Sequence, residues 1–145
     1  MRDFRALTSW TVVTNFFIVI GAGHGIAFLG LIEIFWIPYI NREDFSLSLT
    51  APYDKSLYAA ALFSFVGQVL LIISFFPKKG ASKFWSKAIG LVLLWIGFYY
   101  LTHDLRFNNA AWLGFRFGLP FLICSIVLFI VVVRDRVINK RFSTL

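Results

Sequence analysis

Long apolar runs separated by short charged clusters dominate the pattern of the chain. Four runs approach or exceed the length of about 20 mostly apolar residues that a membrane-spanning helix needs. They predict an all-α integral membrane protein with helices at about residues 10–39, 55–76, 84–102 and 111–133. Pro77 follows the second run, and because proline cannot continue a helix it marks the end of that element.

Two features of the runs define the expected architecture. The connections between them are too short to hold a separate domain, so residues 1–145 are predicted to form one up-down bundle of four transmembrane helices. The first run is longer than one span requires and contains the glycine-rich stretch 21–25. Because glycine weakens a helix, we expect a kink or an unwound turn at this stretch.

The positions of the basic residues predict the orientation in the membrane. Ten of the fourteen Lys and Arg residues lie in segments 2–5, 78–87 and 134–141, which the four-helix arrangement places on one side. Basic residues favour the cytoplasmic side, so both termini are predicted to be cytoplasmic. The expected location is a bacterial inner membrane.

Composition supports membrane residence and excludes several classes of protein. Of the 145 residues 59% are hydrophobic and 14% are charged, and the mean hydropathy is +0.80. A soluble core cannot bury that much apolar surface, so the lipid bilayer is an expected partner. The net charge of +7 is explained by the cytoplasmic anchors, and no nucleic acid partner is expected. The single cysteine, Cys124, excludes an intrachain disulfide, and neither a metal nor a cofactor is expected.

Small residues at regular spacing predict where helices pack closely. In lipid, helices associate through close packing and polar contacts, and glycine allows the closest approach. Two GxxxG patterns and one pair seven residues apart supply these positions, namely Gly21 and Gly25, Gly114 and Gly118, and Gly90 and Gly97. Such faces serve packing within the chain, contact with a second subunit, or contact with lipid.

Glu33 is the strongest candidate for a functional residue within the apolar runs. An ionisable side chain at membrane depth is costly and therefore marks a candidate site. On a straight helix Asn15 and Glu33 share one face, which is predicted to point into the bundle. Two interpretations remain open: a buried ion pair between Glu33 and Arg116, or a carboxyl group that handles protons or substrate.

His24 lies near the middle of the first run and has two interpretations. It is either a neutral histidine bonded to a backbone carbonyl or to Gln68, or a ligand of haem or metal. The other histidine, His103, is predicted at a different depth, which argues against a bis-histidine haem.

A polar cluster is predicted near the outer ends of the helices. It consists of Glu33, His103, Asp104, Arg106 and Arg116, which come from three predicted helices. Together they suggest a pocket open to the outside or to the outer leaflet. The adjacent His103 and Asp104 suit acid–base chemistry, and equally a helix cap followed by a turn.

Three functions follow as hypotheses. The first is a non-enzymatic accessory subunit that packs against partner membrane proteins or a second copy of the chain. The second is a binder or transporter of a small molecule or lipid that uses the outer cluster. The third is a membrane-embedded enzyme that uses His103 and Asp104. The sequence contains no P-loop, Rossmann or HExxH motif, which favours a non-enzymatic function.

Overall fold

The computed structural model describes residues 4–22, 25–35, 39, 48, 53–76, 80–106 and 108–142. Its elements in chain order are α1 (Arg5–Phe16), β1 (Val19–Ala22), β2 (Gly25–Phe28), α2 (Leu29–Phe35), α3 (Tyr53–Ile73), α4 (Gly80–Thr102) and α5 (Asn109–Phe142). The described part of the chain is therefore mostly helical, with one short two-stranded sheet.

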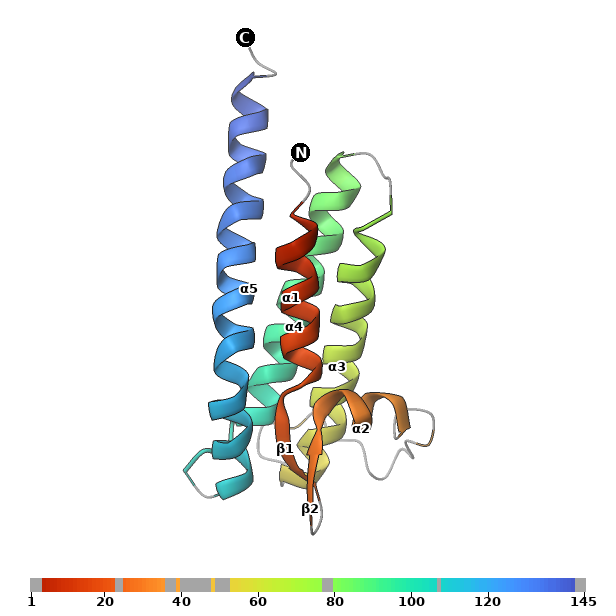
Figure 1. The fold of residues 1–145 in the computed structure, drawn as a ribbon, viewed down its shortest axis with the longest axis vertical. Helices are drawn as coiled ribbons and strands as arrows, with labels where there is room; N and C mark the ends of the chain where they lie inside the picture. The colour runs from red at the N-terminus through yellow and green to blue at the C-terminus, as the bar shows by residue number, and fades with distance from the viewer. Residues whose placement is uncertain are drawn as a thin grey trace.

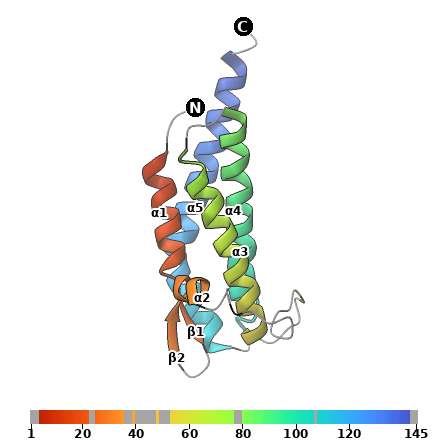
Figure 2. The same ribbon diagram turned by 90° about the vertical axis from the view of Figure 1, so that its right-hand side faces the viewer.

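The three long helices α3, α4 and α5 form the body of the molecule. They run side by side along its long axis, and α1 packs alongside them (Figures 1 and 2). Each contains a segment long and apolar enough to cross a membrane, at Lys55–Ile73, Ser82–Thr102 and Asn109–Ile138. The predicted membrane helices at these three places are confirmed by length and composition. α5 continues beyond its predicted end into the basic tail and extends past the other helices (Figure 1).

The prediction of a single helix over residues 10–39, interrupted at most by a kink or an unwound turn, is wrong. Helix α1 ends at Phe16, and strands β1 and β2 then form an antiparallel hairpin in which Val19 pairs with Phe28 and Ala22 with Gly25. Two sequence features explain the break. Glycine costs about 1 kcal/mol relative to alanine in a helix, and branched residues such as Val19 suit strands better than helices. The chain therefore unwinds over a whole hairpin rather than over a single turn.

Pairing between the two strands and packing of β1 against α5 accommodate this break. The backbone groups on the facing edges of the two strands pair with each other, and Leu29 N donates to Ile18 O at 2.8 Å at the base of the hairpin. Strand β1 packs against α5, and a Cβ atom at Gly21 would lie only 2.6 Å from the Cβ atom of Ala110. Ile26 and Phe28 of β2 are 74% and 40% exposed, so it is β1, and not the whole hairpin, that packs into the bundle. Gly21 and Gly25 therefore serve a hairpin instead of a helix–helix contact.

Glycines bring α3 and α4 into close contact. Gly67 and Gly90 face each other, so a Cβ atom on Gly67 would lie 2.8 Å from the carbonyl oxygen of Gly90. The two helices are equally close at one end of this interface, where Gly97 of α4 lies against Ala60 and Ser64 of α3. Backbones this close gain dispersion energy. This gain does not require the hydrophobic effect, so it can also hold helices together in lipid.

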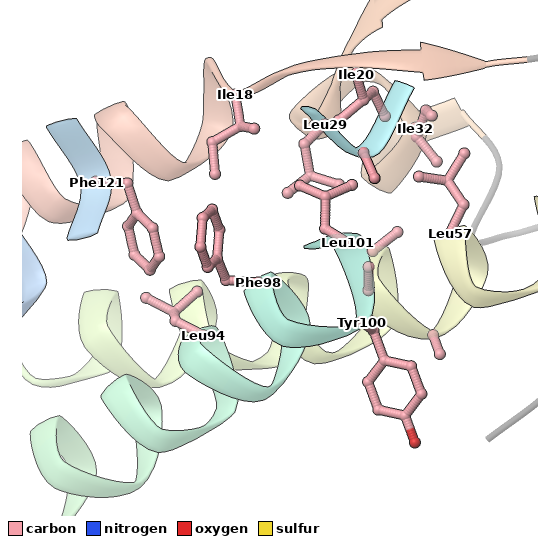
Figure 3. Packing of buried hydrophobic residues seen from close by; sticks show 14 of the residues in the cluster. Ile18, Ile20, Leu29, Ile32, Leu57, Leu94, Phe98, Tyr100, Leu101 and Phe121 are labelled. Atoms are coloured by element: carbon pink, nitrogen blue, oxygen red, sulfur yellow. The ribbon is translucent and has the colours of Figure 1, made fainter. Parts of the chain in front are cut away.

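A hydrophobic core joins α4 and α5 to the hairpin. Phe98 of α4 lies against Gly118 and against the fully buried Phe121 of α5, with ring centroids 5.7 Å apart. Figure 3 shows these rings beside Ile18 and Leu94. The Trp95 indole donates to Ser125 Oγ at 2.9 Å in the same contact.

We expect Gly97→Ala to destabilise the bundle. The new methyl group would lie 2.6 Å from Ser64 Oγ and 2.9 Å from Ala60 O, and backbone cannot yield as a flexible side chain can. The overpacking should cost about 1–3 kcal/mol, more than the helix propensity that alanine adds. Thermal unfolding in detergent measures the effect. Gly25→Ala, at an exposed hairpin position, is the control, and equal melting temperatures for the two variants would contradict the packing argument.

Candidate functional site

Three buried polar side chains meet in the interior between α1, α2 and α3. The Gln68 Nε2 amide donates to Asn15 Oδ1 at 2.8 Å and to Glu33 Oε1 at 3.2 Å. The exposed fractions are 0% for Asn15, 3% for Glu33 and 6% for Gln68. We call these three residues the amide–carboxyl cluster.

The hairpin is what assembles this cluster. On a straight helix Asn15 and Glu33 would be separated by about 27 Å along the axis, because each residue adds 1.5 Å. In the structure Asn15 occupies the last turn of α1, and β1 and β2 carry the chain away and back. α2 then begins beside the end of α1, where Gly30 lies against the Phe16 ring. Both residues therefore reach one donor on α3.

Helix α1 has polar residues inside and apolar residues outside. Thr8, Thr11 and Asn15 are fully buried at helical spacing, whereas Trp10 is 61% exposed and Val13 is 43% exposed. The two threonine hydroxyls donate to the carbonyls of the preceding turn, at 2.8 and 2.9 Å. This polarity is the reverse of a soluble amphipathic helix and suits a segment whose outer face contacts lipid.

The surroundings of Glu33 determine what its carboxyl group can do. In the part of the chain that the structure describes, no Lys, Arg or His forms an ion pair with Glu33, and its side-chain partner is Gln68. Transferring an unpaired carboxylate out of water is costly, so this environment disfavours the charged form. A half-turn of the Gln68 amide would present its oxygen, so that one side chain can serve an ionised carboxylate as donor or a protonated carboxyl as acceptor.

Asn15 contributes a donor that the cluster does not use. Its Nδ2 atom is buried and has no hydrogen-bond acceptor in the described structure. A buried amide donor without a partner costs about 1–3 kcal/mol. This donor lies on the residue that already bonds Gln68, so the cluster has spare hydrogen-bonding capacity next to its carboxyl group.

The ion pair between Glu33 and Arg116, one of the two interpretations that the sequence left open, is not formed. Arg116 is exposed on α5, and its guanidinium lies 5.8 Å from the Trp112 ring centroid. The glycine spacing explains this outcome. Gly114 and Gly118 face α4, and a residue two positions from each points to the opposite side of the helix. Arg116 instead borders an open hollow of about 340 Å³, with Asn109, Trp112 and Leu113.

The other outer-side candidates lie at the end of α4 and in the turn after it. His103 Nδ1 is 2.9 Å from Tyr100 O, and the Asp104 carbonyl accepts from Asn108 N at 3.0 Å. Arg106 is exposed. No hydrogen bond or ion pair among the described residues joins these side chains to Glu33. His24 lies outside the described residues.

Gln68 is the residue whose importance the sequence does not reveal. The sequence indicates it only as a possible partner of His24. The sequence could have indicated its importance through one feature, its position near the middle of an otherwise apolar run. A buried amide at such a position needs hydrogen-bond partners from other elements.

Neither metal-binding geometry nor similarity to known proteins assigns a role to the site. Among the residues that the structure describes, no group of three or more His, Cys, Asp or Glu side chains is placed to hold a metal ion. No protein-family model, curated protein or solved structure matches the chain.

We expect Gln68→Leu to destabilise the fold by about 1–3 kcal/mol, because it leaves two buried polar groups without their donor. Thermal or denaturant unfolding in detergent measures the loss. Adding Asn15→Leu should recover part of it, since that change removes one of the stranded groups. If the double variant is less stable than the sum of the two single changes predicts, the hydrogen bond is not what couples these positions.

Proposed function

We propose that this membrane protein is a proton-responsive binder or carrier, and that Glu33 is the group that gains and loses the proton. One observation carries the proposal: a carboxyl group that is 3% exposed has, among the described residues, an amide for its side-chain partner instead of a cation. Ionisable groups retained inside a membrane bundle commonly mark ion or proton sites.

The break in the first segment supports a binding role. Two short helices, α1 and α2, flank non-helical backbone, and each contributes one polar side chain to the cluster. Interrupted helices of this kind form substrate and ion sites in membrane carriers, since they free polar groups at depth. The unused donor of Asn15 adds a position for a small polar ligand.

The alternative hypothesis of an accessory subunit depends on glycine faces that are free to meet a partner. Gly97, Gly114 and Gly118 instead lie against residues of this same chain. The apolar side chains that remain exposed on α5, such as Ile123 and Ile130, have the character of a lipid-facing surface. The enzyme hypothesis likewise gains no support from His103, whose ring nitrogen Nδ1 contacts a backbone carbonyl.

We also propose that the protein crosses the membrane four times, with both termini on the cytoplasmic side of a bacterial inner membrane. α1 and β1 together pass along the length of the bundle (Figure 1). The start of α1, the start of α4 and the end of α5 lie towards one end. We call it the basic end, because it carries Arg5, Lys83, Lys87, Arg134 and Arg136.

Cysteine labelling tests this topology. In a Cys124→Ser background, Asn109→Cys should react with an impermeant maleimide added to intact cells, because α5 begins at the end opposite the basic end. Ser82→Cys should react only after permeabilisation. Labelling of both positions in intact cells would contradict the proposed orientation.

Infrared spectroscopy tests the role of Glu33. In reconstituted vesicles, a pH change should reveal the C=O stretch of a protonated carboxyl that shifts in D₂O. Glu33→Gln should abolish this band while circular dichroism stays unchanged. The matched control is Asp104→Asn, a carboxyl outside the cluster, which should keep the band. Persistence of the band in Glu33→Gln would rule out Glu33 as the proton-binding group.

A further inference from the structure

An arginine on α5 lies over two aromatic rings of α4 at the basic end. The guanidinium carbon of Arg136 is 4.0 Å from the Phe84 ring centroid and 5.6 Å from the Trp85 ring centroid. The two rings contact each other edge to face, with centroids 5.6 Å apart. Stacking on an aromatic face attracts the cation and fixes the plane of the guanidinium. The donor edges of Arg136 are therefore held in a defined direction.

The charge of Arg136 is not neutralised within the described chain. Arg136 forms no ion pair there, and its Nη1 atom is buried without a hydrogen-bond acceptor. A guanidinium has five N–H donors, and aromatic faces supply no oxygen to accept them. The side chain is thus oriented for an anion that the protein does not itself provide.

Lys87, one turn after Phe84 on α4, is a second buried cation at the basic end, and its ammonium group is 5.8 Å from the Phe4 ring centroid. It takes part in a further interaction within the chain, so the anion site is assigned to Arg136 alone.

The position along the helices indicates what kind of anion fits. Phe84 and Arg136 lie near the ends of the apolar segments Ser82–Thr102 and Asn109–Ile138, at the level expected for lipid headgroups. Trp85 is 56% exposed, and tryptophan favours this interfacial level. Ile89, one helical turn after Trp85 on α4, is also exposed and provides apolar surface on the same face. A ligand here meets both anion donors and a surface for acyl chains.

We propose that Arg136, held by Phe84 and Trp85, binds the phosphate group of an anionic phospholipid in the leaflet at the basic end. Arginine suits this role because its fork of donors bonds two phosphate oxygens at once. The site is separate from the amide–carboxyl cluster and does not depend on any role of Glu33.

Lipid retention tests the site directly. The full-length protein in nanodiscs of phosphatidylcholine with phosphatidylglycerol should retain phosphatidylglycerol on release into native mass spectrometry. Arg136→Ala should lower its affinity for phosphatidylglycerol about tenfold, the loss expected when a charge-assisted bidentate contact is removed. Arg134→Ala, which removes an equal charge from an exposed position two residues away, should change it much less. Equal losses in both variants would indicate diffuse charge attraction and overturn the proposal.

The shape of the arginine side chain and the source of the phosphate group can each be tested separately. Arg136→Lys keeps the positive charge but removes the planar guanidinium with its paired N–H donors. The variant should therefore fold normally but bind phosphatidylglycerol more weakly than the wild type does. Unchanged affinity in this variant would contradict the bidentate contact. Inorganic phosphate at matched concentration in phosphatidylcholine nanodiscs should not raise the melting temperature. If it stabilises the protein as much as phosphatidylglycerol does, the site binds free phosphate and not a lipid.

Discussion

Backbone hydrogen bonding across the break between α1 and α2 is the constraint on which the interior of this protein depends. Inside a lipid bilayer an unpaired amide costs several kcal/mol, so a chain can leave the helical state only if another pairing replaces it. β1 and β2 supply that pairing for each other, and the bond from Leu29 to Ile18 closes the hairpin. The reversal sets the start of α2 beside the end of α1, and this brings Glu33 within reach of Gln68.

Close packing of the long helices supports the same interior. Gly67, Gly90 and Gly97 let α3 and α4 approach until backbone meets backbone, which leaves no room between them for lipid at these positions. α3 can therefore present Gln68 towards α1 and α2 while its opposite contact stays tight. Removal of one of these glycines would disturb the cluster indirectly, because it would shift the helix that carries the shared amide.

The sequence predicted the long helices well and the first segment poorly. Apolar runs of about 20 residues have few alternatives to a membrane helix, so α3, α4 and α5 could be located from hydropathy alone. The glycines at 21–25 signalled a weak point, but hydropathy does not distinguish a kink from a hairpin. Helical periodicity placed Asn15 and Glu33 on one face of a single helix, yet the structure brings them together by a reversal of the chain, which helical periodicity does not predict.

For the candidate site, Glu33 could be singled out because a carboxyl in an apolar run is costly whatever surrounds it. The partner of Glu33 could not be predicted from the sequence, because complementary charge favoured Arg116. In the structure Gly114 and Gly118 face α4, so Arg116 between them points away from the interior, and Gln68 is the partner instead.

The energetics of the amide–carboxyl cluster argue that it is more than a structural contact. Hydrophobic residues of similar size can often replace buried polar groups with no loss of stability, so stability alone does not require Glu33 at this position. An ion pair would have neutralised the carboxyl, and the structure provides an amide in its place. An amide can donate or accept with equal ease, so it stabilises both protonation states of its neighbour where a cation would stabilise only one. That property costs stability, and it is the property that the proposed exchange of a proton at Glu33 would require.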